Sequence, residues 1–555
     1  MPKGNQKNKF RLHRGALCFC LGAMATLSIL LPYLYIENTE KKTPFFRNVE
    51  RLVDTIEKRT LESGPTHNIE AVAPEPVVPR PESEAVAPEP VAPRPESEAV
   101  APEPVAPRPE SEAVAPEPVV PQPIELFQPL VTLDNPIADE ICTGMQQAFQ
   151  AYMRDAWKAD EYMPVQKRGT NTFGGKGLTI IDSLDTLHLM GLNDEFARAR
   201  AFVEADFHFG GHINVFENTI RVLGGLLSTY SLTKDELFLH KAKVVGEVLL
   251  GAFPQRIPCG VIDTNRPGYC GSQSWAGGKS VNAEVGTLAV EFVALSKFTG
   301  DTRWSDKIQA INNYWQEHSH NLLQMNIDPK SERMSGPATI GGGIDSTYEY
   351  LIKLRQLTGD RLAGDLYNTF EKMIVEQMFV TYGETTFARA AGSDDLEHLG
   401  CFLGGMLIMG KKYVKEGLAM TETCARMYTT NPSGIACDKV MIQRDGSIHC
   451  VNDLYLLRPE AVESIFYAWR ETHDQKWRDY ARDIWRGIAK HCQVDSGGFT
   501  DVRHVTSDTP TKMDKQESWF LAETLKYLWL TFQPDSVIPL DKYVFNTEAH
   551  PIEVF

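Results

Sequence analysis

The chain has 555 residues, which is more than one average domain contains. Its 73 Asp and Glu residues outnumber its 56 Lys and Arg residues, so the formal net charge is −17. Because nucleic-acid binding depends on basic residues that neutralise phosphates, this balance argues against a nucleic-acid-binding protein. The acidity fits a soluble domain with an acidic stalk; attraction of a cationic partner is the other interpretation.

The N-terminus has the pattern of a membrane anchor. Residues 1–14 contain basic residues and no acid, and residues 15–36 (GALCFCLGAMATLSILLPYLYI) contain no charged side chain. At about 1.5 Å per residue, such a run spans the roughly 30 Å hydrocarbon core of a bilayer. A cleaved signal peptide is the competing interpretation, but its apolar core is usually shorter. We expect a cytoplasmic tail at 1–14, a transmembrane signal anchor at 15–36 and a lumenal remainder.

A proline-rich segment separates this anchor from the globular part. Residues 71–126 hold four tandem copies of a fourteen-residue unit that begins as AVAPEPVVPRPESE. Alanine and valine are almost its only apolar residues, so the repeat cannot offset the entropy cost of ordering a folded solenoid. Proline-rich chains instead form extended, semi-rigid spacers. We therefore expect residues 37–135 to be a disordered stalk.

Eight of the ten cysteines follow the predicted anchor. An even number in an oxidising lumen favours disulfides, and the absence of a CxxC pair argues against a zinc ribbon. Three pairs lie close in the sequence and are candidates, although their connectivity stays open: Cys259/Cys270, Cys401/Cys424 and Cys437/Cys450. Cys142 and Cys492 have no near partner.

From residue 136 onward the chain is typical of an all-α domain. Apolar residues recur at spacings of three and four in many segments, among them DSLDTLHLMGL, AEVGTLAVEFVALSKFTG and SWFLAETLKYLWLTF. Loops rich in Gly, Pro and Asp separate these segments, and strand-like alternation is scarce. Paired helices closed into a toroid would suit the pattern. The last residues, YVFNTEAHPIEVF, predict two short extended pieces around a polar turn.

Three carboxylates stand in separate apolar, helix-like segments: Glu217 in VFENTIRVLGGLL, Asp345 in GGGIDSTYEYL and Glu460 in LRPEAVESIFY. A buried charge is costly unless it is paired, binds a ligand or takes part in acid–base chemistry. Several converging acids on a helical scaffold favour cleavage of a sugar linkage, in which one acid protonates the leaving oxygen and another activates water.

Each of these acids also has a structural interpretation. Glu217 and Arg221 are four residues apart and could form a surface ion pair. Asp345 could cap the N-terminus of its helix. Glu460 and Glu463 could simply favour a helix N-terminus.

Other polar residues in apolar segments have the same ambiguity. Asp182 and Asp185 are interpreted as structural pairs or rim contacts. His398 is either a core histidine or a ligand-binding residue. Trp519 is either core or, beside Glu523, a surface that stacks on a sugar.

Eight blocks, taken in order, resemble the class I α-1,2-mannosidases of glycoside hydrolase family 47. The resemblance covers roughly residues 140–550. The blocks are GLTIIDSLDTLHLMGL, VFENTIRVLGGLLS, VEFVALSKFTGD, DSTYEYLIK, HLGCFLGG, LRPEAVESIFYAWR, FLAETLKYLWLTF and FNTEAHP.

This resemblance implies an (α/α)7 barrel over residues 136–555, closed by a C-terminal β-hairpin, with a Ca²⁺ ion at the bottom of its pocket. The ion would be held by the hydroxyl and carbonyl of Thr547, which suits a cation that takes oxygen ligands. The activity implied is inverting hydrolysis of α-1,2-linked mannose from high-mannose N-glycans. Glu217 is then the general acid, acting through water, Glu460 the general base, and Asp345 the third catalytic acid.

The resemblance also implies a set of residues that line the sugar pocket or the water shell of the ion. They are Arg221, His398, Arg458, Glu463, Trp519, Glu523 and Glu548. It further implies a disulfide between Cys401 and Cys424.

One position departs from the family. Two residues before the catalytic Asp, enzymes that remove a single mannose have Arg and many Golgi enzymes have Leu, whereas this chain has Gly343. We expect more room there and broader trimming. We expect a single-pass type II protein of the Golgi membrane, with the endoplasmic reticulum as the alternative compartment. The alternative function is a weakly catalytic or non-catalytic protein that recognises mannose in glycoprotein quality control.

Overall fold

The computed structural model describes residues 135–390 and 392–555. The predicted tail, the predicted anchor and nearly all of the predicted stalk lie outside these residues. In the part of the chain that is described, no helix is long and apolar enough to cross a membrane.

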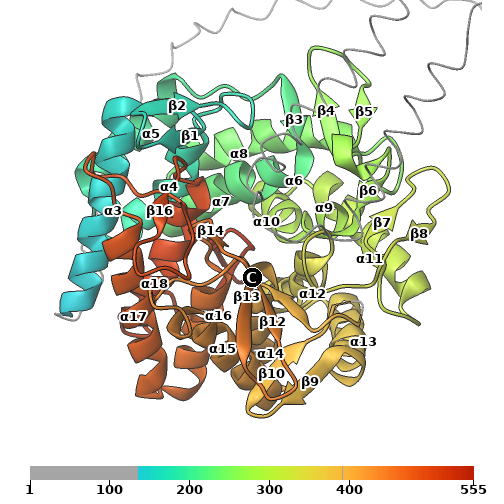
Figure 1. The fold of residues 1–555 in the computed structure, drawn as a ribbon. Coiled ribbons are helices and arrows are strands. Elements are labelled where there is room, and N and C mark those ends of the chain that lie inside the picture. Colours follow the sequence, from blue (N-terminus) through green and yellow to red (C-terminus); the bar gives the residue numbers. More distant parts are fainter. Residues whose placement is uncertain (1–134, 391) are drawn as a thin grey trace, which may run out of the picture. The chain divides into compact units, whose positions relative to one another are not determined.

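Seven α-helices form an inner ring (Figure 1). They are α4 (Leu178–Leu189), α7 (Gly224–Thr233), α10 (Ala289–Thr299), α12 (Asp345–Thr358), α14 (Phe402–Gly410), α16 (Glu460–Thr472) and α18 (Leu525–Thr531). Each contacts the next in this order, and α4 contacts the π-helical segment Phe520–Thr524 that leads into α18. Every residue of α4 and of α18 is buried, including the charged residues Asp182, Asp185 and Lys526.

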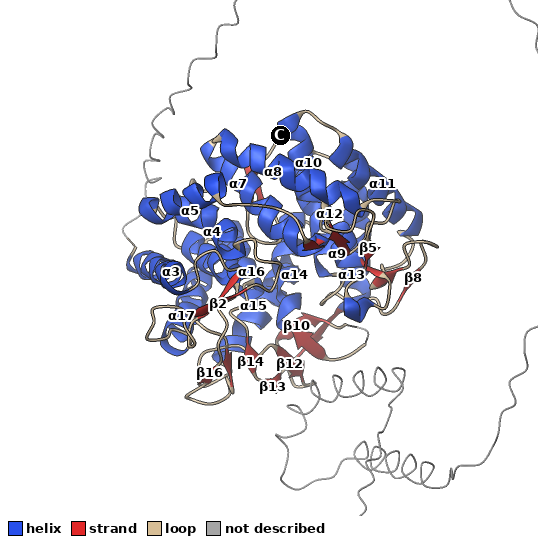
Figure 2. Ribbon diagram, turned by 90° about the horizontal axis from the view of Figure 1, so that it is seen from above, coloured by secondary structure: helices blue, strands red, loops and turns tan. Residues whose placement is uncertain are grey.

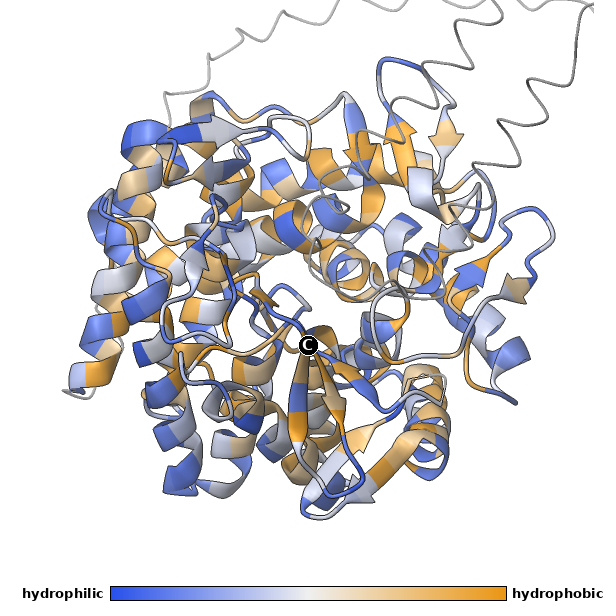
Figure 3. Cartoon of the chain, in the orientation of Figure 1, coloured by the Kyte–Doolittle hydropathy of each residue, from blue (hydrophilic) through white to orange (hydrophobic). Residues whose placement is uncertain are grey.

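A second set of helices packs outside the ring. It comprises α3 (Pro136–Asp155), α5 (Asn193–Ala205), α8 (Glu236–Leu249), α11 (Arg303–His318), α13 (Arg361–Met378), α15 (Val414–Thr429) and α17 (Gln475–His491). Each contacts at least one inner helix: α5 contacts α4, for example, and α17 contacts both α16 and α18. These helices are amphipathic; α17 buries Trp477, Ala481, Ile484 and Ile488 at spacings of three and four. Figure 3 shows hydrophilic and hydrophobic residues mixed along them.

The strands are short and occur as antiparallel pairs or three-stranded sheets between the helices. Figure 2 shows most of them on one side of the helices. They are β1 (Glu161–Met163), β2 (Arg168–Thr170), β3 (His212–Asn214), β4 (Val261–Asp263), β5 (Cys270–Gly271), β6 (Ser280–Val281), β7 (Asn326–Ile327), β8 (Met334–Ser335), β9 (Phe379–Tyr382), β10 (Thr385–Ala388), β11 (Asp395–Glu397), β12 (Lys439–Ile442), β13 (Ile448–Asn452), β14 (Leu454–Tyr455), β15 (Val502–Arg503), β16 (Thr511–Lys512), β17 (Tyr543–Phe545) and β18 (Pro551–Glu553). The predicted helix-rich fold is confirmed.

The predicted pair of extended pieces at the C-terminus is the hairpin β17–β18, in which Tyr543 pairs with Glu553. Two buried lysines hold its turn. Nζ of Lys353, on α12, donates to the carbonyl of Asn546 at 2.9 Å, and Nζ of Lys526, on α18, donates to the carbonyl of Ala549 at 2.6 Å. Both lysine side chains are fully buried. The turn is thereby fixed to two inner helices.

A buried charge network completes this attachment. His550, in the same turn, contacts Asp182 through Nε2 at 3.0 Å and Asp185 through Nδ1 at 2.8 Å. Lys526 lies 2.9 Å from Asp185. Although burial alone would raise it, Lys526 and His550 hold the pKa of Asp185 below its usual range. The interpretation of Asp182 and Asp185 as structural pairs is therefore confirmed.

All three candidate disulfides are present: Cys259–Cys270, Cys401–Cys424 and Cys437–Cys450. Within the described residues, Cys142 and Cys492 form no disulfide.

The buried network predicts a large loss of stability when its lysine is neutralised. Lys526→Met keeps an apolar side chain of similar length but removes one of the two cationic partners of Asp185 and the hydrogen bond to the carbonyl of Ala549. We expect the free energy of unfolding to fall by about 3–5 kcal/mol, measured by denaturant titration. Lys411→Met is the matched control, because its pair with Glu471 is largely exposed and should matter by less than about 1 kcal/mol. Equal effects of the two substitutions would contradict the assignment.

Candidate active site

A cavity of about 230 Å³ lies among the inner helices and brings together residues from distant parts of the sequence. Its lining includes Glu217, Asp345, Glu460 and Thr547, the four residues expected to act on substrate or metal. Of the other predicted site residues, six line it: Arg221, Arg458, Glu463, Trp519, Glu523 and Glu548. His398 does not line the cavity, because its ring lies behind Glu460. A separate cavity of about 290 Å³, beside Arg470 and Tyr543, contains none of the predicted residues.

Glu217 is positioned where a strand passes directly into a helix. β3 ends at Asn214, whose side chain caps the short helix α6 (Val215–Glu217) by accepting from the Glu217 N–H at 3.1 Å. The next residues, Asn218–Leu223, form a π-helical segment before α7. Segments of this kind occur often at functional sites. The predicted helix is present, with this local change of pitch at the site.

Arg221 forms a buried ionic contact with Glu217. Its Nε donates to Oε2 of Glu217 at 2.8 Å, and its Nη1 donates to Glu548 at 2.6 Å. Only 5% of the Arg221 side chain is exposed, so the alternative of a surface ion pair is wrong. The guanidinium also lies against the rings of Phe173 and Trp519, at 5.5 and 5.2 Å from their centroids. This packing fixes the charge beside Glu217.

His398 lies behind Glu460. Its ring contacts Oε2 of Glu460 through Nδ1 at 2.8 Å and the hydroxyl of Tyr428 through Nε2 at 2.8 Å, and its side chain is fully buried. Arg458 approaches Oε1 of Glu460 at 3.6 Å and donates to Asp438 at 2.6 Å. Although burial would raise it, His398 and Arg458 hold the pKa of Glu460 below its usual value. This environment keeps the carboxylate ionised.

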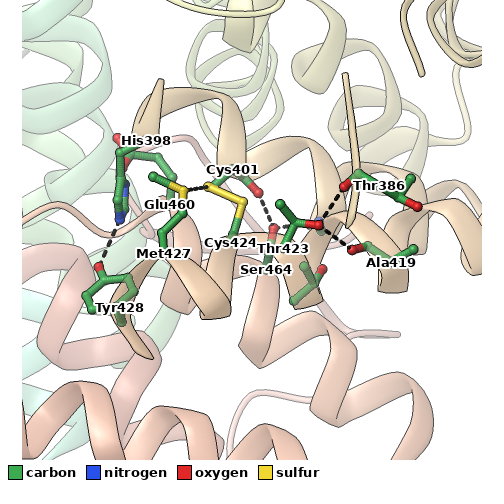
Figure 4. The surroundings of a disulfide bond; sticks show 12 residues. Thr386, His398, Cys401, Ala419, Thr423, Cys424, Met427, Tyr428, Glu460 and Ser464 are labelled. Carbon is green, nitrogen blue, oxygen red and sulfur yellow. Dashed lines mark hydrogen bonds and ion pairs between the residues drawn. A yellow bond between two sulfur atoms is a disulfide. The ribbon is translucent and has the colours of Figure 1, made fainter. Parts of the chain in front are cut away.

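The disulfide Cys401–Cys424 fixes the segment that carries His398 (Figure 4). Residues His398–Cys401 form a 3-10 turn that leads into α14, and Cys424 belongs to α15. Ser464, one turn after Glu460 on α16, donates to the carbonyl of Cys401 at 2.6 Å. The disulfide therefore ties the histidine segment to α15, and the Ser464 hydrogen bond ties it to α16, the helix that begins at Glu460.

Asp345 is the first residue of α12, and the cap position belongs to Ile344, which makes no side-chain cap. The interpretation of Asp345 as an N-cap is therefore wrong. Its Oδ1 accepts from the Ser346 N–H at 2.9 Å. Burial is the main cause that raises the pKa of Asp345 to about 7. Near neutral pH this carboxyl can therefore hold or release a proton.

Gly343, two residues earlier, has a φ of +97°, which favours glycine. A Cβ at this position would also come within 2.9 Å of Cγ of Met325. The space expected from the lost side chain is thus partly occupied by Met325. Broader trimming stays a prediction.

The base of the cavity collects carboxyl groups. Burial, followed by repulsion from neighbouring carboxylates, raises the pKa of Glu463 and Glu523 well above the usual range. Burial also raises the pKa of Glu548, although Arg221 opposes it. Lys353 is 3.7 Å from Glu463. Carboxyl groups thus outnumber the cations beside them, and a bound cation or retained protons would relieve their repulsion.

Thr547 lies in the hairpin turn at this base. Its N–H donates to the hydroxyl of Tyr350 at 3.2 Å. Within residues 135–390 and 392–555, its own hydroxyl and carbonyl oxygens make no hydrogen bond to the protein. Two free oxygen donors beside an excess of carboxyl groups fit a hard cation such as Ca²⁺. The described residues contain no group of three or more side chains able to hold a metal directly, so the fit is to an ion that keeps much of its water.

Two acids near the catalytic candidates were not predicted from the sequence. Glu349 lines the cavity. Glu284, on α9 (Asn282–Gly286), is buried, and its Oε2 has no hydrogen-bond partner in the described chain. Burial, followed by the charge of Glu217, raises the pKa of Glu284 to about 7. Both acids stand in apolar helical segments, the same signal that singled out Glu217.

A sugar-sized cavity lined by carboxyl groups held in opposite protonation states, on a ring of paired helices, is typical of a glycoside hydrolase. Comparison with known proteins supports this class. The family description Glycosyl hydrolase family 47 matches residues 144–554, and the chain belongs to this family.

Several named proteins are similar over most of the chain. "Mannosyl-oligosaccharide 1,2-alpha-mannosidase MNS1" of Arabidopsis thaliana is 36% identical over 450 residues, which cover 76% of this chain and 79% of that protein. "Mannosyl-oligosaccharide 1,2-alpha-mannosidase IB" of Homo sapiens is 36% identical, with coverages of 76% and 71%. The solved "alpha-1,2-mannosidase from Trichoderma reesei" superimposes with a TM-score of 0.70 at 25% identity, covering 76% of this chain and 99% of that one.

Proposed function

We propose that this protein hydrolyses terminal α-1,2-linked mannose residues of high-mannose N-glycans. The single observation that carries the proposal is the meeting of Glu217, Asp345 and Glu460 in one cavity. The names of the similar proteins support the same reaction and substrate. No observation favours the alternative of a non-catalytic mannose-recognising protein.

The scaffold is proposed to be an (α/α)7 barrel with the hairpin β17–β18 as its plug. Seven inner helices in a closed order of contacts, each covered by at least one outer helix, support this count. The turn of the hairpin lines the cavity with Thr547 and Glu548, which supports a plug at the base of the cavity.

In the proposed mechanism Glu460 is the general base. Its low pKa keeps it ionised, and His398 holds Oε2 so that Oε1 remains to accept a proton from water. Glu217 is the general acid, delivering a proton to the leaving oxygen through a water molecule. Arg221 holds this carboxyl in place through Oε2.

Attack by water on the face opposite the leaving group would invert the anomeric carbon. Asp345 is the third acid of the site, and a pKa of about 7 allows it to hold or release a proton during the cycle. The remaining lining residues, Arg458, Glu463, Trp519, Glu523 and Glu548, would bind the sugar or the waters around it.

The proposed cofactor is one Ca²⁺ ion held by the hydroxyl and carbonyl of Thr547. When bound, such an ion orients substrate hydroxyls and supplies charge that offsets the surrounding carboxylates. The rest of its shell would be water, positioned by the acids at the base of the cavity.

The proposed setting is the lumen of the secretory route. The sequence expectation of a type II anchor, with a Golgi location or the endoplasmic reticulum as alternative, is retained as part of the proposal.

Mannose release tests the activity. The wild-type protein should release mannose from α-1,2-linked mannobiose, and Glu460→Gln should lower kcat by about 10²–10⁴-fold because the general base is lost. Glu471→Gln, on the last turn of the same helix, is the control and should keep full activity. Absence of release by the wild-type protein, or unchanged kcat in Glu460→Gln, would refute the assignment.

Chelation tests the metal. Treatment with EGTA should abolish mannose release and lower the Tm, and added Ca²⁺ should restore both, because an ion that binds only the folded state stabilises it. Thr547→Val removes one oxygen ligand and should weaken Ca²⁺ binding by at least about tenfold. Thr430→Val, an exposed threonine, should leave the calorimetric Kd unchanged. Full activity in EGTA would exclude the proposed cofactor.

The position of His398 predicts a pH effect. His398→Phe removes the contact that stabilises ionised Glu460, so the pKa of Glu460 should rise. Because the base must be ionised to act, the acidic limb of kcat/KM should move to higher pH, by about one unit. His320→Phe, on an exposed position, serves as control. An acidic limb that stays in place would show that His398 does not tune Glu460.

A further inference from the structure

Trp275 is the one tryptophan of this chain whose side chain is left in solvent. All nine tryptophans lie within the described residues, and 66% of Trp275 is exposed while the others are buried or half-buried. The rings of Trp519 and Trp469 are each covered by an arginine. Among the described residues no ring or cation stacks on Trp275. Both faces of the indole are thus without an aromatic or cationic neighbour.

The backbone beneath this ring is firmly held. Trp275 belongs to a 3-10 turn, Ser274–Ala276. The next residue, Ala276, packs with Val281, Ala283 and Met325 in a small apolar cluster separate from the main core. Lys279 donates to Ser335 at 2.8 Å. Because a small core anchors this loop, the exposure of Trp275 is not the fraying of a loose segment.

The loop belongs to the same structural unit as two catalytic candidates. β3, which leads into α6 and Glu217, pairs with β4, and β4 pairs with β5, four residues before Trp275. After the loop, the Ala283 N–H donates to the carbonyl of Gly343 at 3.0 Å, two residues before Asp345. Figure 1 shows β4, β5 and β6 beside α6 and α9. The loop is therefore joined by backbone hydrogen bonds to the segments that lead to Glu217 and Asp345.

We propose that Trp275 forms a sugar-binding subsite for a mannose of the glycan other than the one being cleaved. An indole face carries negative charge density, and the ring hydrogens of a pyranose present a complementary, weakly positive surface. Single exposed apolar residues are common, but this ring is unstacked, lies on an anchored turn and is joined through backbone hydrogen bonds to the segments of two catalytic candidates. The inference rests on the proposed function, because it assumes a branched mannose substrate.

The nearby Tyr269 is a weaker candidate. It is 37% exposed, but the guanidinium of Arg266 lies 3.9 Å from its ring centroid and covers one face. The free stacking surface of this loop is therefore that of Trp275. At Gly343, the chain lacks a long side chain that could bind the glycan by hydrogen bonds, and Met325 occupies the adjacent space. Stacking on Trp275 supplies a contact to the rest of the glycan without that side chain.

The test compares a branched and a minimal substrate. Trp275→Ala should raise KM for a nine-mannose N-glycan, lowering kcat/KM by about 3- to 10-fold with kcat unchanged, because only the stacking contact is lost. It should leave kcat/KM for α-1,2-linked mannobiose unchanged, since a disaccharide does not reach beyond the cleavage site. Trp275→Phe should restore most of the loss. Val244→Ala, at an exposed position on the outer helix α8, is the matched control.

Binding separates this inference from the proposed function. In a Glu460→Gln background, calorimetry should show a Kd for the nine-mannose glycan that is 3- to 10-fold weaker when Trp275 is also replaced by Ala, with an unchanged Tm. An unchanged Kd, or an equal loss of kcat/KM on both substrates, would overturn the subsite. If the wild-type protein cleaves neither substrate, the proposed function fails, and the calorimetric comparison still decides whether Trp275 binds the glycan.

Discussion

The structure depends on a set of buried charges that fix one turn of chain. Lys353 and Lys526 each give a hydrogen bond to a carbonyl of the turn 546–550, and His550 joins that turn to two aspartates of α4. Buried ions of this kind are stable only when every partner is in place. The hairpin can therefore occupy the ring of helices in only one register, and this register sets the position of Thr547 and Glu548.

The charge balance changes sharply over a short distance. At the turn, the acid Asp185 is matched by Lys526 and His550, and its pKa is low. In the cavity, the carboxyl groups are crowded, and the pKa values of Glu463 and Glu523 are high. The first arrangement balances its charges and stabilises a fixed structure. In the second, the excess of carboxyl groups favours binding of a cation, a proton or a polar ligand. The same hairpin turn contributes to both, since His550 belongs to the first arrangement and Thr547 and Glu548 line the cavity.

Much of this could be predicted from the sequence, because the signals are local. Periodicity identified many of the helices, and isolated acids in apolar segments identified Glu217 and Glu460. What could not be predicted depends on distant partners. Nothing near His398 in the chain shows that it lies behind Glu460 rather than in the cavity. The cap interpretation of Asp345 is wrong because Asp345 already belongs to the helix and its side chain accepts from the adjacent Ser346 N–H. Glu284 also stands in an apolar helical segment but was not among the predicted acids.

Gly343 shows how a single residue can be read too simply. The missing side chain at Gly343 predicts free space. The backbone there is left-handed, however, and Met325 lies close to where a Cβ would be, so glycine is also required by the fold. Met325 in turn packs on the small cluster that supports Trp275. The absence of a side chain at Gly343, two residues before Asp345, is thereby linked, through one methionine, to a loop that holds an aromatic ring in solvent. In the proposed function, this loop would contact the uncleaved part of the glycan, while the fixed hairpin turn would position the residues around the sugar that is cleaved.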